Sequence, residues 1–273
     1  MEKLGIIAGS GALPRLLAED CAARGQDYVV VQFKEVELDW TETHPVISAV
    51  FEKPGKLFKN LKKAGVATVT MGGAMSRPRL NPLRFDATGL RLAPVVMNAL
   101  KSGDNSTLGI IAALFEAENF KVIGVHEAMP ALLAASGMPT KAQPSDEDQR
   151  DAKRAAEIVE VLGAADVGQG AVVAQGLCLG LESIQGTDAM LRFVTENPAR
   201  LPDKNGSSGV LLKRSKPGQD MRLDMPAIGP DTFTAAAAAG LAGVVVHAGE
   251  TLVLGLDETV ARADELGLFL WVR

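Results

Sequence analysis

The chain is poor in cysteine, histidine and aromatic residues. Its two cysteines, Cys21 and Cys178, are too few for a disulfide framework, and neither lies in a CxxC pair, which argues against a zinc site built on thiolates. Free thiols are typical of proteins in a reducing cytosol. The histidines, His44, His126 and His247, are scattered and lack the spacing of a metal-binding pair.

Long apolar runs and targeting signals are also missing. A bilayer-spanning helix needs a stretch of roughly 18 or more apolar residues, and the sequence contains none. The first residues, Met-Glu-Lys, lack the basic and apolar regions of a signal peptide. We therefore expect a cytoplasmic protein that is soluble or peripheral to a membrane.

The charge and composition limit the function further. The formal net charge of −5 argues against nucleic acid as a partner, because binding the phosphate backbone needs a strong basic patch, although a local basic groove remains compatible with it. Apolar residues make up 47% of the chain and aromatic residues only 4%, so we expect cores built from Ala, Val, Leu and Ile. A length of 273 residues favours two domains.

Strand and helix patterns alternate through the first half of the chain. Apolar runs predict strands over 4–8, 28–33, 46–51, 66–71 and 121–125. Helical spacing predicts a helix that follows the segment Gly9–Pro14 and runs to about Arg24, and further helices over 54–63, 93–101 and 106–119. This alternation predicts an N-terminal domain over 1–130 with a parallel, doubly wound sheet.

The second half has a different pattern. Residues 131–144 are rich in proline and small residues and read as a linker. Ser145 is a candidate N-cap for a helix that ends near Gly163. Further segments predict a distinct C-terminal α/β (α+β) domain over 145–273, with strands at 170–174, 177–181, 209–213, 244–246, 252–254 and 268–272, and helices from 187, from 231 to 240 and from 257. The predicted fold class is therefore α/β with two domains.

A glycine-rich loop follows the first predicted strand. Gly9 and Gly11 let the backbone approach a phosphate, and the helix after them offers free N–H groups. The third glycine of a dinucleotide-binding fingerprint is absent, because Pro14 stands there. The loop thus predicts either a nucleotide or sugar-phosphate contact by Gly9, Ser10, Gly11, Ala12 and Leu13, or only a tight turn.

Arginine side chains follow the strand at 66–71. The carboxyl ends of parallel strands are where ligands bind, and a guanidinium group grips phosphate with two hydrogen bonds. Arg77 is therefore a candidate substrate contact. The alternative is a solvated pair of arginines, Arg77 and Arg79.

Two polar segments in the second half carry candidate catalytic residues. In the first, Gln169 precedes a strand, and Thr187 caps a helix that holds Asp188 near its N-terminus, where Asp188 either serves chemistry or complements the helix dipole. In the second, Asp220, Arg222 and Asp224 alternate, so on an extended chain they would share one face. An exposed strand of alternating charges would give the same pattern. Phosphoryl transfer needs cations on the phosphate oxygens and a carboxylate as base or metal ligand.

Taken in order, these segments resemble the LpxI family of UDP-2,3-diacylglucosamine pyrophosphatases. The resemblance spans the whole chain. It rests on Leu4-Gly-Ile-Ile-Ala-Gly-x-Gly-x-Leu-Pro14, Ser76-Arg77-Pro78, His126-Glu127, Asp166-Val-Gly-Gln-Gly-Ala-Val-Val173, Gln185-Gly-Thr-Asp-Ala-Met-Leu-Arg192, Lys216-Pro-x-Gln-Asp-x-Arg-x-Asp-x-Pro-x-Ile-Gly229 and Gly240-Leu-Ala-Gly243. Gln185 stands where relatives are expected to have glutamate, which makes it a weak candidate for a metal ligand.

The resemblance implies a specific activity. The family hydrolyses UDP-2,3-diacylglucosamine to UMP and 2,3-diacylglucosamine 1-phosphate (lipid X) in lipid A biosynthesis, by attack of water on the α-phosphate and with a divalent cation, typically Mg²⁺. It implies a Rossmann-like N-terminal domain, a distinct C-terminal domain with the ligand between the two, a homodimer, and a peripheral location at the cytoplasmic face of the inner membrane. Asp224 matches the aspartate expected to be essential. Asp188 is its expected partner for Mg²⁺, and Lys213, Lys216 or Arg222 is expected to neutralise the pyrophosphate.

Two other functions compete with this interpretation. A non-catalytic lipid- or nucleotide-sugar-binding protein would hold the same ligand, but Asp188 and Asp224 would repel its phosphates unless a metal intervened. An NAD-dependent oxidoreductase would use the loop at Gly9, but it would need the third glycine that Pro14 replaces.

Overall fold

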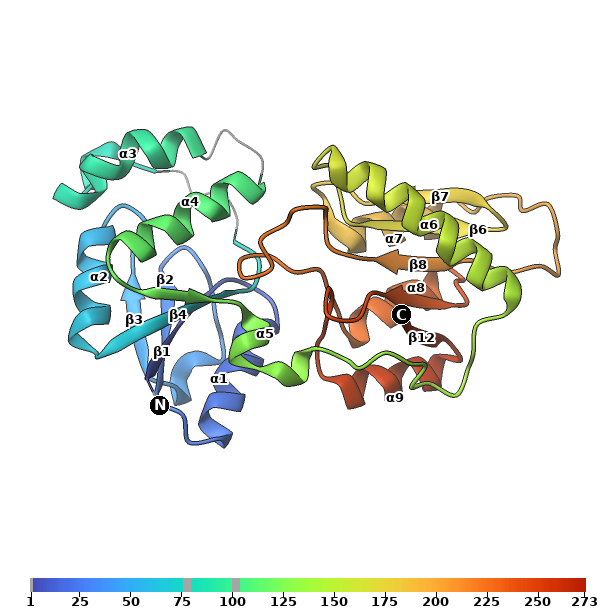
Figure 1. Cartoon of the computed structure of the whole chain (residues 1–273), viewed down its shortest axis with the longest axis horizontal. Coiled ribbons are helices and arrows are strands. Elements are labelled where there is room, and N and C mark those ends of the chain that lie inside the picture. The colour runs from blue at the N-terminus through green and yellow to red at the C-terminus, as the bar shows by residue number, and fades with distance from the viewer. Residues whose placement is uncertain (1, 76–79, 100–103) are drawn as a thin grey trace. The chain divides into compact units, whose positions relative to one another are not determined.

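The computed structural model of the chain describes residues 2–75, 80–99 and 104–273, and they form two compact units (Figure 1). The first unit holds the residues up to Pro130 together with Asp220–Asp224. The second holds Ala131–Gln219 and Met225–Arg273. The sequence did not lead us to expect that residues 220–224 would belong to the first unit.

The first unit contains a five-stranded parallel sheet with the strand order β3-β2-β1-β4-β5. Its strands are β1 (Lys3–Ala8), β2 (Tyr28–Phe33), β3 (Val46–Ala49), β4 (Val66–Gly72) and β5 (Lys121–Ile123). Its helices are α1 (Leu13–Ala23), α2 (Pro54–Lys63), α3 (Ala87–Ala99), α4 (Asp104–Ala117) and the short α5 (Val125–Ala128). The predicted doubly wound parallel sheet is confirmed.

Apolar side chains explain how helices and sheet pack in this unit. Leu57, Phe58 and Leu61 of α2 and Phe115 of α4 bury themselves on one face of the sheet, as expected for amphipathic helices whose apolar stripe faces a core. Helix α1 packs against β1, β2 and β4. Since all strands are parallel, their carboxyl ends lie at one edge, where α/β proteins bind ligands.

Helix α3 begins earlier than the sequence suggested. We expected it over 93–101, but it starts at Ala87 and continues through Pro94. The Asp86 carboxylate accepts hydrogen bonds from the Gly89 N–H at 2.7 Å and from the Lys56 N–H at 3.0 Å. Asp86 thus caps this end of the helix. The stabilisation from this cap offsets the loss of the backbone hydrogen bond that Pro94, which has no N–H group, cannot donate.

The second unit contains a five-stranded mixed sheet with the order β12-β10-β8-β6-β7. Strands β8 (Val210–Lys213), β10 (Gly243–Val246) and β12 (Phe269–Val272) are parallel, whereas β6 (Gly170–Ala174) is antiparallel to both β8 and β7 (Leu177–Leu181). A second, parallel pair joins β9 (Ala227–Ile228) to β11 (Leu252–Val253). The helices are α6 (Asp146–Ala164), α7 (Gly186–Glu196), α8 (Pro230–Ala238) and α9 (Leu256–Leu266).

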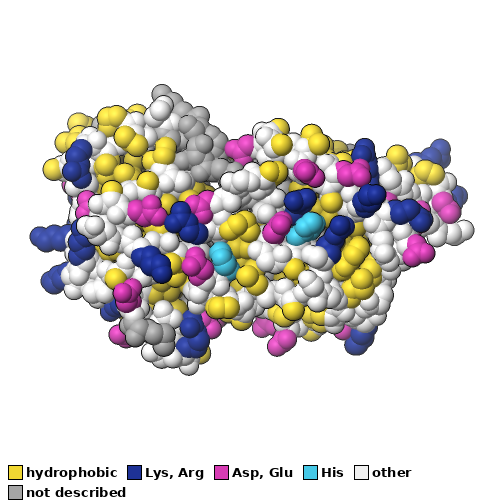
Figure 2. Space-filling view, viewed as in Figure 1, with side chains coloured by type: hydrophobic (Ala, Val, Ile, Leu, Met, Phe, Trp, Pro, Cys, Tyr) yellow, Lys and Arg dark blue, Asp and Glu magenta, His cyan; other side chains and the backbone are white. Residues whose placement is uncertain are grey.

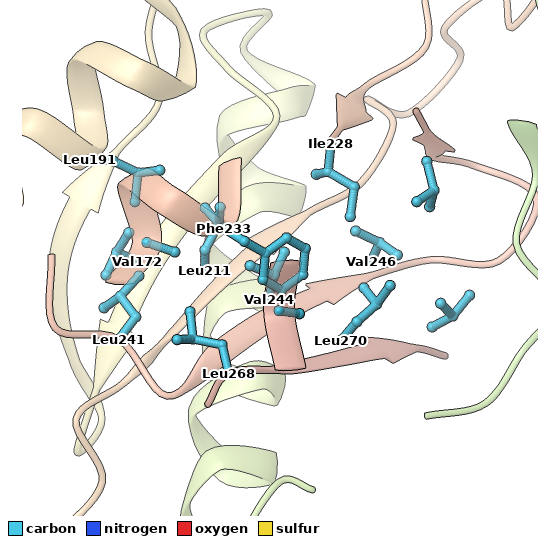
Figure 3. Close-up of a cluster of buried hydrophobic side chains, with 14 of the residues drawn as sticks. Val172, Leu191, Leu211, Ile228, Phe233, Leu241, Val244, Val246, Leu268 and Leu270 are labelled. Atoms are coloured by element: carbon cyan, nitrogen blue, oxygen red, sulfur yellow. The ribbon is translucent and has the colours of Figure 1, made fainter. Parts of the chain in front are cut away.

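Alternate residues of this sheet face two different cores. On one face, Leu211 and Val244 pack with Leu191 of α7 and Phe233 of α8 (Figure 3). On the other face, the strands pack against α6 through a separate buried cluster: Ala152, Ala155, Val159, Ala171, Val173, Val210, Leu212, Val245 and Phe269. Helices therefore cover both faces, which confirms a second α/β domain.

Residues 131–144 are attached to the second unit. Leu133 forms a bridge to Leu252, Gly137 forms a bridge to Val272, and the Thr140 hydroxyl accepts the Leu270 N–H at 2.9 Å. The capping of α6 agrees with the sequence: the Ser145 hydroxyl accepts the Asp148 N–H at 3.2 Å, and the Asp148 carboxylate accepts the Ser145 N–H at 2.9 Å. Within the described ranges, every helix is too short or too polar to cross a bilayer.

Asp151 of α6 stabilises the turn between β6 and β7, and its loss is expected to cost stability. Gln175 and Gly176 both have positive φ, and Asp151, 1% exposed, accepts their N–H groups at 2.8 and 2.7 Å. Asp151→Ala should lower the free energy of unfolding by about 1–3 kcal/mol, because two backbone donors lose a charged acceptor. Urea unfolding would show this beside Glu160→Ala, an exposed change on the same helix. Equal effects of the two changes would contradict this role.

Candidate functional site

The glycine loop lies at the carboxyl end of β1, in the first unit. The Ser10 N–H donates to Ala74 O at 2.7 Å, and the Ala74 N–H donates to Ser10 O at 3.0 Å. A Cβ at Gly9 would lie 2.5 Å from Ala74 O, whereas at Gly11 (φ 91°) it would meet nothing within 4 Å. Gly9 is therefore required by the packing of two loops, and Gly11 by the backbone conformation.

The helix after the loop has a free N-terminus. Ala12 is the N-cap of α1 and Leu13 its first residue, and no side chain among the described residues caps it. Pro14 occupies the first turn, as is common at helix starts. The remaining N–H groups and the positive end of the helix dipole lie at the edge where ligands bind, which suits an anion. The geometry of the loop is compatible with both alternatives from the sequence, a phosphate contact and a tight turn without a ligand. Arg77 lies outside the described residues.

The segment with Asp220, Arg222 and Asp224 is a turn, not an extended strand. The N–H groups of Leu223 and Asp224 both donate to Asp220 O, at 3.0 and 3.3 Å. Leu223 is buried in the core of the first unit, which holds the turn in place. The expectation that the three charged side chains share one face of an extended chain is therefore wrong.

Arg222 is engaged by two carboxylates of its own unit. Its Nε and Nη2 donate to Asp220 at 3.0 and 2.7 Å, and its Nη1 donates to Glu116 of α4 at 3.1 Å. The hydrogen bonds from Arg222 lower the pKa of the Asp220 carboxyl. A Cβ at Gly124 would lie 3.2 Å from the Arg222 Cα. The turn thus packs against Gly124, directly after β5, and Asp224 at its end is half-buried.

In the second unit, Lys213 and Thr187 meet in a buried cluster. Lys213, 5% exposed, donates from Nζ to Thr187 Oγ1 at 2.7 Å and to Ala227 O at 3.2 Å. The Thr187 hydroxyl donates to Glu182 Oε2 at 2.9 Å, and this carboxylate lies 3.7 Å from Lys213 Nζ. Buried charges need such pairing, because unpaired burial is costly.

This cluster corrects the expected role of Thr187 as a helix cap. Gln185 is the N-cap of α7, and Thr187 lies inside its first turn, bonded to Glu182. Asp188 follows it and is exposed at the start of the helix. Sequence reasoning missed Glu182, although a lysine that ends an apolar strand, as Lys213 does, signals a buried carboxylate partner.

A second polar group lies at the carboxyl edge of the second sheet. Arg214 and Ser215 follow β8, and His247 follows β10. Gln169 precedes the antiparallel β6, so it reaches the same edge, where its carbonyl accepts the Arg214 N–H at 3.1 Å. A histidine with basic and acidic side chains around it is visible on one face of this unit (Figure 2).

Several polar atoms in this group are buried and lack partners among the described residues. They are Gln169 Oε1, Arg214 Nε and His247 Nε2. Glu250 accepts the Ser215 hydroxyl at 3.0 Å, but it lies 3.9 Å from Arg214 Nε and from His247 Nδ1. Buried groups of this kind need a water molecule, an ion or a ligand atom as their hydrogen-bond partner. Of these residues the sequence indicated only Gln169, although polar residues directly after parallel strands are a usable signal.

His247 makes stability depend on pH. Burial lowers the pKa of its imidazole below the ordinary 6.5, the Arg214 guanidinium lowers it further, and Glu250 opposes them. As pH falls below 6.5, the unfolded chain takes up a proton that the folded chain does not, so the free energy of unfolding decreases until the folded pKa is reached. His247→Gln should therefore lose less stability than the wild type when urea unfolding is compared at about pH 7.5 and pH 5. Parallel decreases in both proteins would contradict this.

Lys216 is also held by a carboxylate. Its Nζ donates to Asp166 Oδ1 at 2.7 Å, and its side chain is largely buried. Neighbouring Pro217 packs against Gly163 at the end of α6. Lys216 is thus a positioned cation on the loop after β8.

The carboxylates of Asp188 and Asp224 are of the ligand type that a magnesium ion prefers, although the described residues do not form a complete set of protein ligands around a metal. Across the described parts of the chain, no group of three or more His, Cys, Asp or Glu side chains is arranged to hold a metal. Magnesium needs only one or two carboxylates, because phosphate oxygens and water complete its six ligands. Asp224 belongs to the first unit and Asp188 to the second, and their pairing stays a prediction.

Comparison with known proteins gives matches along the whole chain. Residues 3–132 match the family described as the LpxI N-terminal domain, and residues 135–271 match the LpxI C-terminal domain. The UDP-2,3-diacylglucosamine pyrophosphatase LpxI of Caulobacter vibrioides is 39% identical over 271 residues, which cover 99% of this chain and 97% of that protein.

Two solved structures match at lower sequence identity. The CobK precorrin-6A reductase matches with a TM-score of 0.31 and 13% identity, over 98% of this chain and 85% of that chain. AtPrR2 in its apo form matches with a TM-score of 0.26 and 18% identity, over 44% of this chain and 36% of that chain. Similarity at this level carries no information on function.

Proposed function

Because this chain belongs to the LpxI family along its whole length, we propose that it hydrolyses UDP-2,3-diacylglucosamine to UMP and lipid X in lipid A biosynthesis. The observation that carries this proposal is the 39% identity, over 99% of the chain, to a protein named for cleaving this pyrophosphate. Water attacks the α-phosphate, the bond from that phosphorus to the bridging oxygen breaks, and lipid X leaves with the bridging oxygen.

Each unit contributes residues of a suitable chemical kind. In the first unit, the N–H groups of the loop at Gly9–Gly11 and of the α1 N-terminus bind a phosphate, and Asp224 orients the attacking water. In the second, Lys213 and Thr187 fix the start of α7 and thereby the position of Asp188, while Lys216 and Gln169 contact the substrate. Asp188 and Asp224 would hold Mg²⁺, which would supply positive charge to the phosphate oxygens.

An apolar pocket of about 620 Å³ in the second unit supports a lipid substrate. Leu179, Leu181, Met190 and Phe193 line it, together with Ala189, the neighbour of the proposed metal ligand. We assign this pocket to an acyl chain. Removal of the lipid from a membrane fits a peripheral location at the inner membrane, and we expect a homodimer as in the family.

Changing the pocket should weaken binding of the acylated substrate selectively. Phe193→Asp places a charge where an acyl chain would bind, so KM for UDP-2,3-diacylglucosamine should rise by about tenfold. A tenfold change corresponds to the binding free energy expected from the apolar contact between the Phe193 ring and an acyl chain. Binding of UDP-glucosamine, which lacks the acyl chains, is the control and should not change. A uniform loss for both ligands would contradict the assignment of this pocket to an acyl chain.

The direct test of the activity is a product assay with the purified full chain. UDP-2,3-diacylglucosamine and Mg²⁺ should give UMP and lipid X in equal amounts by phosphorus NMR, and EDTA should stop the reaction. Binding without cleavage would favour a non-catalytic binding protein. The oxidoreductase alternative has no support in the site, since Pro14 occupies the place of the third glycine.

A further inference from the structure

A second pocket, of about 300 Å³, lies in the first unit, and its lining contains no residue of the glycine loop. Lys34 directly follows β2, and Ser48 belongs to β3, so the pocket lies at the carboxyl ends of these two strands. Lys53 and Lys56 come from the start of α2, and Arg84 comes from the short 3-10 helix Pro82–Arg84. This is the ligand-binding edge of a parallel sheet, and nothing in the proposed hydrolysis uses it.

The lining of this basic pocket is unusual in its charge. Lys34, Lys53, Lys56 and Arg84 are cationic, and no carboxylate lines the pocket with them. Over the ranges that the structure describes, none of the four forms an ion pair, although other cations of the unit, such as Lys62 and Arg222, do. Four unpaired cations around one cavity, in a chain of net charge −5, repel one another, and a bound anion would relieve that repulsion.

Two acidic side chains lie close to the pocket residues, and each accepts a hydrogen bond from the backbone. The Asp86 carboxylate accepts the N–H groups of Lys56 and Gly89. Glu52 is 3% exposed; its Oε1 accepts the Asn81 N–H at 3.2 Å, and its Oε2 is buried without a hydrogen-bond partner among the described residues. The N-terminus of the ten-residue α2 faces the same side of the pocket, and the Asp86 carboxylate at the Lys56 N–H already balances the positive end of its dipole.

We propose that this basic pocket binds the phosphate group of a ligand, through residues other than those of the glycine loop. Lysine ammonium and arginine guanidinium groups bind phosphate through charge-assisted hydrogen bonds. The volume lies at the lower end of the range for ligand pockets, so it fits a phosphate or pyrophosphate group with a small attached moiety. The source of the phosphate is a soluble phosphorylated compound or a phosphomonoester lipid headgroup.

Lysine footprinting on the full chain tests the site without depending on hydrolysis. Acetylation of lysines, followed by mass spectrometry, is measured with and without pyrophosphate, and separately with vesicles of phosphatidylcholine that contain phosphatidic acid. Lys53 and Lys56 should be protected, whereas Lys59 and Lys63, exposed on the same helix but outside the pocket lining, should react as before. Protection by pyrophosphate identifies a soluble ligand, and protection only by the vesicles identifies a headgroup.

Paired variants complete the test. Lys53→Gln with Lys56→Gln should weaken binding of the protecting probe by at least about tenfold at this site, whereas Lys59→Gln with Lys63→Gln should leave it within about twofold. Arg84→Gln, which leaves α2 unchanged, should weaken binding as well. Protection of no lysine by either probe, equal protection of all four, or equal losses in the two paired variants would overturn the proposal.

Discussion

Asp224→Asn is expected to lower kcat for UDP-2,3-diacylglucosamine by about 10³-fold or more, because loss of a carboxylate that holds the metal or orients the water removes interactions made in the transition state. Asparagine has the same shape as aspartate. The turn is held by the hydrogen bonds to the Asp220 carbonyl and by the buried Leu223 side chain, and both remain in the variant. We therefore expect normal folding and continued binding of substrate. The measurement is kcat by UMP release at saturating substrate and Mg²⁺.

The neighbouring aspartate provides the matched control for this variant. Asp220 lies one helical turn before Asp224 and is paired with Arg222. Asp220→Asn removes the same charge from the same turn but should reduce kcat by less than about tenfold. If Asp224→Asn kept activity within tenfold of the wild type, or if both variants lost activity equally, the role of Asp224 would be wrong.

Lys213→Met is expected to destabilise the second unit by about 3–5 kcal/mol, because it leaves the Glu182 carboxylate buried without its cation. Both side chains are more than nine-tenths buried, and Ala227 O also loses a donor. Urea unfolding measures the change, and Lys153→Met, on the exposed face of α6, is the control with little expected effect.

A double variant separates the buried pair from simple loss of packing. Lys213→Met with Glu182→Gln removes both charges, so it should recover part of the stability lost in the single variant. Thr187 would keep a hydrogen-bond acceptor in the glutamine side chain. A double variant as unstable as the single one would show that the pair does not account for the loss.

The strands and α6 were predictable because their signals are local. Strands β1, β2 and β4 are nearly continuous apolar runs, as buried parallel strands must be. Helix α6 has a capping serine and acidic residues in its first turn, whose effect depends only on neighbours in the chain. The family assignment was predictable for a different reason, since its motifs recur in order along the sequence.

The parts that sequence reasoning missed depend on distant residues. The alternation of Asp220, Arg222 and Asp224 resembles a strand, but burial of Leu223 and the bond from Arg222 to Glu116 favour a turn. Thr187 has the residue type of a helix cap, but Lys213 and Glu182 bind its hydroxyl instead. Neither partner could be chosen without knowing which segments the sheet brings together.

The most direct test of the proposed reaction is hydrolysis in ¹⁸O-labelled water, with mass spectrometry of both products. Attack of water on the α-phosphate predicts one labelled oxygen in UMP and none in lipid X. Label in lipid X would place the attack on the other phosphorus, and the absence of cleavage by a folded protein that binds the substrate would contradict the account altogether.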